Sequence, residues 1–229
     1  MPRLMLLHGF PLDGRMWDAQ RGMLPAAAST PTLYSLGNSM EAWATNVLAG
    51  ASDESLIVVG ASMGGPCALE MARQAGDRVA GLVLVGSKAE HRPEPDLRDG
   101  YIAALREGGV RRVWSEMVGQ FFGPAAARSV VAAAEAIAME QDTDELIRAT
   151  QVFHGRPDYT DVAANWRKPF LVIGGDQDGA VSRRKMRAAA ETAPFGRLHV
   201  IRESGHFPNM ERPAEFNSVL GDFVRSTMH

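Results

Sequence analysis

Cysteine is nearly absent from this 229-residue chain: Cys67 is the only one, so no disulfide can form within it. The lack of an internal disulfide fits a reducing compartment, and we predict a cytoplasmic protein. Neither sign of charge is in large excess, since 24 basic and 27 acidic residues leave a net charge of −3. We therefore expect no surface that binds nucleic acid or an anionic membrane.

Long hydrophobic runs are missing as well. Apolar runs such as Leu4–Leu7 and Leu82–Val85 are far shorter than the roughly 20 residues that a transmembrane helix needs. The first run ends at His8, so we expect no signal peptide. No cluster of His, Cys, Asp and Glu has metal-ligand spacing, and no glycine-rich motif has the spacing of a nucleotide-binding loop. We expect neither a metal nor any other cofactor.

The chain does contain a series of short apolar runs bounded by Gly, Pro or Asp. Runs of this kind, without alternation, are typical of strands buried on both faces of a sheet. We predict strands at Leu4–Leu7, Pro31–Leu36, Ser55–Val59, Gly81–Val85, Pro169–Ile173 and Arg197–Ile201. We predict helices at Arg15–Ala28, Met40–Ala49, Met63–Ala75, Ser182–Thr192 and Pro213–Met228. This alternation indicates an α/β fold, with a mainly parallel sheet of about six strands and helices on both faces.

The interval from Lys88 to Arg167 contains no strand candidate. It holds amphipathic helical stretches at Asp96–Glu107, Val110–Phe122, Ala125–Glu140 and Thr143–Phe153. A helical insertion between parallel strands is expected above their carboxyl ends, where such folds bind ligands. We therefore interpret residues 88–167 as a helical cap, or lid, on a core formed by residues 1–87 and 168–229. The alternative is that these helices pack flat on the sheet.

The sharpest local motif is Gly60-Ala-Ser-Met-Gly64, which follows a predicted strand and precedes a predicted helix. Small residues let the chain make a tight, strained turn, from which a serine hydroxyl projects above the sheet. The amide of Met63 would point into the same space, at a helix N-terminus that favours negative charge. We predict that Ser62 is a nucleophile. The alternative is a glycine-rich turn whose serine only caps the helix.

A serine hydroxyl needs a base, and histidine is the usual one. Of the six histidines, His206 lies in the loop between the last predicted strand and helix, at the same sheet edge as Ser62. The third group must be a carboxylate that orients the imidazole. The turn after the strand Pro169–Ile173 offers Asp176 and Asp178, and aspartates in such turns are often only turn formers.

These motifs resemble the α/β-hydrolase family across almost the whole chain. Leu6–Trp17 is similar to the family's oxyanion-strand segment, Pro169–Val181 to its acid turn, and Ser204–Pro213 to its histidine loop. The three segments stand in the family's order. The acid turn is also similar to that of carboxylesterases of the pimeloyl-carrier-protein methyl ester type.

The resemblance implies roles for particular residues. The family's aspartate lies three positions after a glycine, and counting from Gly175 this position is Asp178. The resemblance also implies that the backbone amides of Phe10 and Met63 stabilise an oxyanion. It implies a structural role for His8, outside proton transfer.

The chain departs from the family pattern near its start. It begins at what would be the third strand, so we expect the N-terminal hairpin to be lacking. The predicted strand Pro31–Leu36 would then lie at the sheet edge, where its proline is tolerated. Ser35–Ser39 replaces the family's usual loop after that strand, and Ser182 replaces a common proline. These changes affect the rim of the expected pocket.

We predict a serine hydrolase that cleaves a carboxylic ester, lactone or thioester with a small to medium apolar acyl part. A Ser62–His206–Asp178 triad would act through an acyl-enzyme, and a small-molecule ester or thioester is the only partner expected. Apolar residues of the predicted cap either line the acyl pocket or pack between cap and sheet. Those assigned to the pocket are Trp114, Met117, Phe121 and Phe122. No charged cluster there predicts selection of a phosphate or a sugar acid.

Other functions are compatible with the same fold. A cofactor-free perhydrolase or haloperoxidase would use the same triad. A carbon–carbon hydrolase would need a polar pocket, which the sequence does not locate. Haloalkane dehalogenases of this fold use an aspartate nucleophile, so Ser62 argues against that chemistry. A ligand receptor with vestigial catalysis is the non-enzymatic alternative. The sequence does not predict the oligomeric state.

Overall fold

The computed structural model describes residues 2–22, 27–51 and 53–227. Within these ranges, six strands form one parallel sheet in the order β2-β1-β3-β4-β5-β6. The strands are β1 (Arg3–Leu7), β2 (Ala28–Ser29), β3 (Leu56–Ala61), β4 (Val79–Val85), β5 (Phe170–Gly175) and β6 (Gly196–Ile201). The α-helices are α1 (Met40–Gly50), α2 (Gly64–Ala75), α3 (Pro95–Phe121), α4 (Arg128–Met139), α5 (Thr143–His154), α6 (Thr160–Asn165), α7 (Arg183–Thr192), α8 (Pro208–Glu211) and α9 (Pro213–Thr227). A 3-10 helix, η1 (Gly14–Trp17), follows β1.

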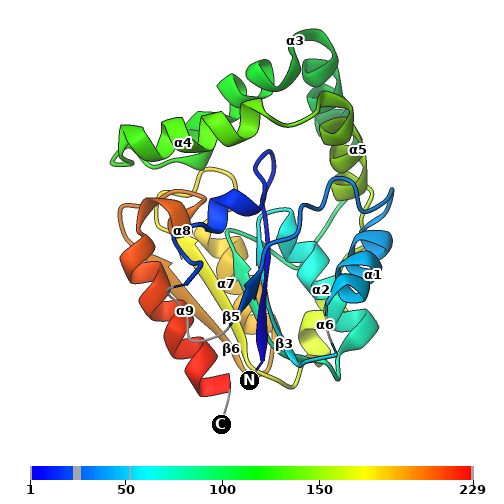
Figure 1. Cartoon of the computed structure of the whole chain (residues 1–229), viewed down its shortest axis with the longest axis vertical. Coiled ribbons are helices and arrows are strands. Elements are labelled where there is room, and N and C mark those ends of the chain that lie inside the picture. Colours follow the sequence, from blue (N-terminus) through cyan, green and yellow to red (C-terminus); the bar gives the residue numbers. More distant parts are fainter. Residues whose placement is uncertain (1, 23–26, 52, 228–229) are drawn as a thin grey trace.

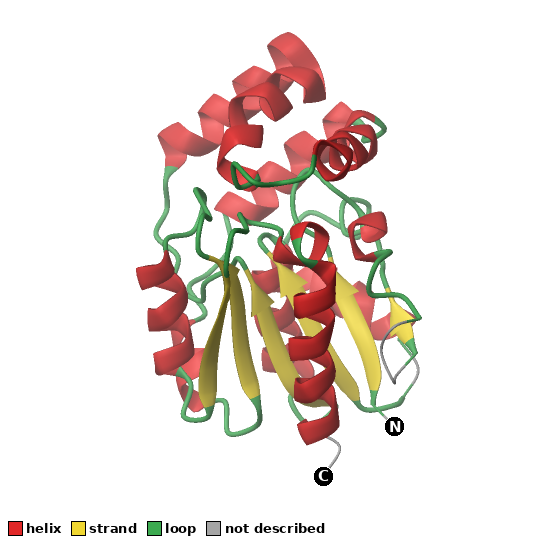
Figure 2. Ribbon diagram, turned by 90° about the vertical axis from the view of Figure 1, so that its left-hand side faces the viewer, coloured by secondary structure: helices red, strands yellow, loops and turns green. Residues whose placement is uncertain are grey.

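Helices cover both faces of the sheet. Helix α9 lies on one face, whereas α1 and α2 lie on the other (Figure 1). The arrowheads of the strands point toward a group of helices beyond the sheet edge (Figure 2), and these are α3, α4 and α5. The parallel six-strand sheet with helices on both faces confirms the predicted fold class.

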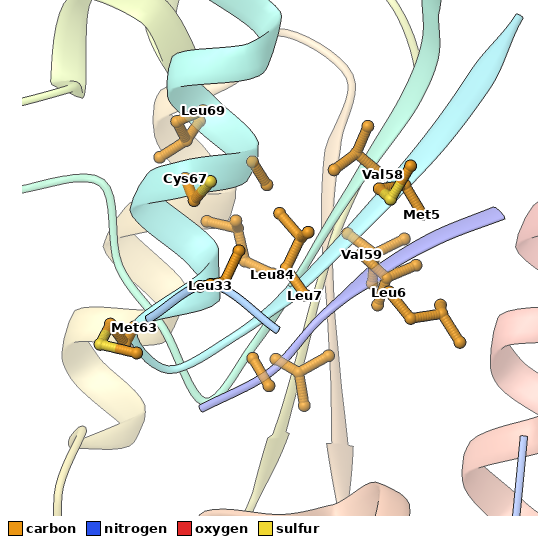
Figure 3. Packing of buried hydrophobic residues seen from close by; sticks show 14 of the residues in the cluster. Met5, Leu6, Leu7, Leu33, Val58, Val59, Met63, Cys67, Leu69 and Leu84 are labelled. Carbon is orange, nitrogen blue, oxygen red and sulfur yellow. The ribbon is translucent and has the colours of Figure 1, made fainter. Parts of the chain in front are cut away.

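The middle strands are apolar because both of their faces are covered. Every residue of β3 and β5 is buried, and β1 and β4 each have a single half-buried residue. Figure 3 shows labelled side chains of β1, β3, β4 and α2 that belong to one buried apolar cluster. Burial of each large aliphatic side chain is worth roughly 1.5–3 kcal/mol. This core fixes the carboxyl ends of the strands, from which the site is built.

The interval from Lys88 to Arg167 forms the helices α3 to α6. The two helices predicted on either side of Gly108-Gly109 are the two parts of α3, and the predicted break is confirmed at Gly109, whose backbone (φ 63°, ψ −161°) is not helical. Helices α3, α4 and α5 lie beyond the carboxyl ends of the strands (Figures 1 and 2). Helix α6 instead packs beside α2 and α7 of the sheet layers.

Two predictions near the N-terminus are wrong. The edge strand is Ala28–Ser29, not Pro31–Leu36, because Pro31 has no N–H and the amide of Leu33 donates to a histidine ring. The helix predicted at Arg15–Ala28 is reduced to η1 and a turn that reaches Gly22 with φ +74°. Residues 23–26 of that prediction lie outside the described residues, as does Met228 of the last predicted helix.

His8 holds the chain where the predicted strand fails. Its buried ring accepts a hydrogen bond from the amide of Leu33 at Nε2 (2.9 Å), and Nδ1 lies 3.2 Å from the carbonyl oxygen of Gly9. Tyr34 packs its ring edge on the imidazole and donates its hydroxyl to the carbonyl of Leu12. Burial lowers the pKa of His8 to about 4, so the folded ring is neutral at pH 7.

This buried imidazole predicts a loss of stability in mild acid. The unfolded chain takes up a proton at the ordinary pKa of 6.5, while the folded ring resists protonation down to about 4. The stability contributed by the neutral His8 ring is therefore complete above pH 7 and decreases as the pH falls through 6.5 toward 4, by about 2 kcal/mol at pH 5. Urea unfolding at pH 7.5 and pH 5 measures the decrease. In His8→Gln, whose amide oxygen can still accept from Leu33, the decrease should be about 2 kcal/mol smaller. An identical pH dependence in both proteins would contradict the assignment.

Candidate active site

Ser62 stands on a sharp turn between β3 and α2. Its backbone has φ +47°, a left-handed conformation that costs a non-glycine residue of order 1–3 kcal/mol. Its amide donates to the carbonyl of Val85 in the next strand (2.8 Å). A Cβ on Gly60 would lie 2.2 Å from the carbonyl oxygen of Gly64, and one on Gly64 would lie 2.5 Å from that of Leu7. The predicted turn therefore depends on both glycines, and it presents a half-buried serine at the strand ends.

His206 and Asp178 are hydrogen-bonded to each other. The distance from His206 Nδ1 to Asp178 Oδ2 is 2.9 Å, and both side chains are only 1% exposed. The other carboxylate oxygen, Oδ1, accepts from the amides of Ala180 and Val181, each at 2.8 Å. Asp176 is exposed and its carboxylate lies 3.4 Å from the amide of Ser204. The structure thus pairs the imidazole with Asp178.

The loop that carries His206 is held by groups that the sequence did not single out. The amide of His206 donates to the carbonyl of Phe121, whose ring stacks on the imidazole at 5.4 Å between centroids. Glu211 accepts from the amide of Gly205 (2.8 Å) and from that of Gly123 (3.0 Å), so it ties this loop to the segment after α3. Burial raises the pKa of Glu211. A lone glutamate in a short helix carries no sequence signal for this role.

His206 and Ser62 line the same cavity. The cavity has a volume of about 270 Å³. Atom Nε2 is buried and has no hydrogen-bond partner among the described residues. An imidazole that donates Nδ1–H to a carboxylate leaves Nε2 free to accept a proton. The hydroxyl of Ser62 makes no hydrogen bond to this nitrogen here.

Two backbone amides border the same cavity. Phe10 and Met63 both line it, and their amides donate no hydrogen bond within the described part of the chain. The segment before Phe10 approaches closely: a Cβ on Gly9 would lie 3.2 Å from the Cβ of Ser62. Two N–H groups beside the serine are therefore available to a bound oxygen atom.

Of the four apolar residues predicted for the pocket, Met117 and Phe121 line the cavity. Trp114 and Phe122 do not line it. They pack on each other with ring centroids 6.1 Å apart, in the apolar layer where the ring of Phe122 also meets that of Phe207. This is the packing alternative considered for such residues.

The cavity wall also contains charged groups that the sequence analysis missed. These are Lys88, Glu94, Arg156 and Lys185. They come from the loops after β4 and α5 and from α7, so they are distant in sequence and show no local cluster. The sequence shows no charged cluster in the predicted cap, whereas the folded chain brings these four charged side chains to one cavity.

Gly86 fixes the distance between the strand ends and the histidine. It has φ +51°, and a Cβ there would lie 2.7 Å from the carbonyl oxygen of His206 and 2.9 Å from its Nδ1. We expect Gly86→Ala to destabilise the protein by about 1–3 kcal/mol and to lower kcat at least tenfold, since the imidazole must move. Gly100→Ala is the matched control, because Gly100 lies in α3 with open space around it. Thermal unfolding and ester hydrolysis measure both; equal behaviour of the two variants would refute the prediction.

The described residues contain neither a metal site nor a membrane-spanning helix. No group of three or more His, Cys, Asp and Glu side chains in residues 2–22, 27–51 and 53–227 is arranged to hold a metal ion. None of the helices in these ranges has the length and apolar character needed to cross a bilayer.

Comparison with known proteins defines the class of the molecule. The model of the alpha/beta hydrolase family matches residues 4–219. The chain belongs to the alpha/beta hydrolase family. It is an enzyme of the esterase-like kind within that family.

Individual relatives span nearly the full chain. A pimeloyl-acyl-carrier-protein methyl ester esterase of Aromatoleum aromaticum is 27% identical over 247 aligned positions, covering 98% of both chains. A malate-bound structure of a thermophilic esterase from Thermogutta terrifontis is 27% identical and superposes with a TM-score of 0.90, over 99% of this chain and 90% of that one. A bromoperoxidase from Bacillus anthracis, 19% identical with a TM-score of 0.82 over 98% and 92% of the chains, shares the fold.

Proposed function

We propose that the protein hydrolyses a small carboxylic ester, with Ser62 as the nucleophile, His206 as the general base and Asp178 as its orienting acid. The main support is the buried His206–Asp178 hydrogen bond, which leaves Nε2 unpaired at the cavity that Ser62 lines. A thioester or lactone carbonyl would be attacked in the same way. The esterase names of relatives that cover nearly the whole chain favour an oxygen ester.

The reaction divides into acylation and hydrolysis of the acyl-enzyme. Ser62 Oγ attacks the carbonyl carbon while His206 Nε2 takes the hydroxyl proton. The carbonyl oxygen becomes an oxyanion, to which the amides of Phe10 and Met63 donate; each such donor is worth roughly 3 kcal/mol. When the intermediate collapses, His206 gives its proton to the departing alcohol, and water then repeats the sequence on the acyl-enzyme.

The missing Ser62–His206 hydrogen bond is compatible with this mechanism. Hydrogen bonds between catalytic groups are often long or poorly aligned before the substrate binds. Rotation about the Cα–Cβ bond of Ser62 changes the direction of its hydroxyl, while Asp178 and Phe121 hold the imidazole in place.

We also propose that residues 88–167 form a cap that completes the pocket, over a core of residues 1–87 and 168–229. Helix α3 contributes Tyr101, Met117 and Phe121 to the cavity wall, and α5 contributes Phe153. Side chains of the core line the opposite part of the same cavity. A ligand bound beside Ser62 would therefore contact both parts.

The proposal is tested with a chain-length series of p-nitrophenyl esters and simple lactones. The cavity volume of about 270 Å³ predicts that turnover is highest for short acyl groups and falls for long ones. Halide-plus-peroxide assays on the same samples detect haloperoxidase activity. The charged cavity wall removes the sequence-based objection to a carbon–carbon hydrolase, so dienone acids belong in the panel. Absence of ester, thioester and lactone hydrolysis would contradict the proposal.

A further inference from the structure

Three cationic side chains line the same cavity as Ser62 and His206. They are Lys88 after β4, Arg156 after α5, and Lys185 in α7. Among the described residues of the wall, the only carboxylate is that of Glu94. His154 also lines the cavity, but burial lowers its pKa to about 4 and it is neutral at pH 7. The wall therefore has more positive than negative groups, although the whole chain carries a net charge of −3.

The three cations lie close enough to influence each other. Burial lowers the pKa of Lys88, and the positive charges of Lys185 and Arg156 lower it further. None of the three side chains forms an ion pair within the described residues; the nearby Glu90 is paired with Arg92 instead. The carboxylates of Glu90, Glu94 and Asp158 lie near enough to favour the charges of Lys88 or Arg156, but none of them forms an ion pair with these two side chains or with Lys185 within the described residues. An anion bound among the three cations would lower the free energy of the site.

Arg156 is the most constrained of the three. It is only 7% exposed, its guanidinium carbon lies 3.8 Å from the centre of the Phe153 ring, and one of its nitrogens donates to the carbonyl of Phe153. Burial lowers the pKa of Arg156 to about 10. The carboxylates of Glu94 and Asp158 favour its charge from a distance, but no described carboxylate forms an ion pair with it. A buried arginine without an ion pair is uncommon, because desolvation of its charge is costly. The stacked ring fixes the planar fork, whose other N–H groups suit two oxygens of one carboxylate.

We propose that the substrate carries a carboxylate at the end remote from the scissile carbonyl, and that Arg156, with Lys88 and Lys185, binds it. This inference rests on the proposed ester hydrolysis and specifies its substrate class. Met117, Phe121 and Val181 supply an apolar part of the wall that suits a short methylene chain between the two ends. At roughly 30 Å³ for each water-sized group, 270 Å³ holds about nine such groups. The substrate class is therefore a monoester of a short dicarboxylic acid.

The test compares two substrates that differ in charge and hardly in shape. Monomethyl glutarate carries the carboxylate, and methyl 5-amino-5-oxopentanoate has a neutral amide in its place. For the wild-type protein we expect kcat/KM to be at least about tenfold higher for the acid, mainly through KM, because a charge-assisted hydrogen bond is worth about 1.5–3 kcal/mol. In Arg156→Gln this preference should fall to about one, through a loss of kcat/KM for the acid. Arg156→Lys should retain part of the preference.

Matched variants separate the local contact from general charge effects. Arg92→Gln also removes one positive charge nearby, but Arg92 is exposed, paired with Glu90 and outside the cavity wall. The Arg92→Gln protein should therefore prefer the acid over the amide substrate as strongly as the wild type does. Because Arg156 is buried, Arg156→Gln could lower the yield of folded protein. Lys185→Gln and Lys88→Gln then provide the second measurement, each reducing the preference at least about threefold.

A binding measurement keeps this inference separate from the proposed function. Calorimetry with glutarate and the Ser62→Ala protein needs no turnover, and Arg156→Gln in that background should weaken binding at least about tenfold. If neutral esters are hydrolysed but wild-type kcat/KM is equal for the matched pair, the inference is wrong while the proposed function stands. If no ester is hydrolysed, the proposed function fails, and glutarate binding alone decides whether an anion site exists. The absence of detectable glutarate binding would then overturn the anion site as well.

Discussion

Replacing Ser62 by alanine is expected to lower kcat for ester hydrolysis by at least about 10⁴-fold. Loss of the serine of a Ser-His-Asp triad costs up to about 10⁶-fold, and only binding and oxyanion stabilisation remain. The fold should persist, because the hydroxyl of Ser62 makes no hydrogen bond within the described residues and its backbone amide and carbonyl keep their partners. The change in unfolding free energy should stay within about 0.5 kcal/mol.

Ser204→Ala is the matched control for this experiment. Ser204 lies in the loop that carries His206, and its buried hydroxyl also lacks a hydrogen-bond partner among the described residues. Its removal should leave kcat within about threefold of the wild type. A fluorophosphonate that modifies serine nucleophiles should label the wild type and the Ser204→Ala protein on Ser62, and should leave Ser62→Ala unlabelled. Retention of more than about 1% of the activity by Ser62→Ala would reassign the nucleophile.

The sequence predicts those parts of this molecule whose structure depends on neighbouring residues. The runs that became β1, β3, β4 and β5 are almost entirely apolar because both faces of each strand are covered. The glycines around Ser62 mark the turn because no larger side chain fits there. These local requirements allow the elements and the serine to be predicted without knowledge of the rest of the chain.

The edge of the sheet was not predictable in this way. The run Pro31–Leu36 has the composition of a strand, but His8 and Tyr34 turn it away from the sheet. The predicted strand would have been a free edge, where few ladder hydrogen bonds oppose such a competing interaction. The observed strand is therefore displaced toward Ala28, and only contacts across the fold reveal why.

The charged residues of the cavity wall were not predictable from the sequence either. Lys88, Arg156 and Lys185 lie in three unrelated segments, each of which has the composition of an ordinary solvated surface. Likewise, Glu211 carries no sequence motif, although it joins the histidine loop to the segment after α3. The function of such residues depends on which segments the sheet topology brings together, whereas the serine, histidine and aspartate are each marked by adjacent glycines.

Replacing Asp178 by asparagine is expected to lower kcat by roughly 10³–10⁴-fold with little loss of stability. The reason lies in the two amides of Ala180 and Val181, which both donate to Oδ1. In the variant they hold the asparagine oxygen at that position, so the new NH₂ group must face His206 Nδ1. The imidazole then has to accept at Nδ1, which places its proton on Nε2, where the attacking hydroxyl requires an acceptor.

Asp176→Asn provides the matched comparison two residues away. Asp176 is exposed, and within the described residues its carboxylate accepts only a long hydrogen bond from the amide of Ser204, so kcat should stay within about threefold of the wild type. Steady-state kinetics at pH 7.5 and thermal unfolding of both variants measure the difference. A large loss in Asp176→Asn with normal turnover in Asp178→Asn would exchange the two roles. Asp178→Ala removes the carboxylate without supplying an NH₂ group. We expect a comparable loss of kcat in Asp178→Asn and Asp178→Ala if both proteins fold. In either variant nothing holds the proton on Nδ1, and this proton is what keeps Nε2 free to act as the base.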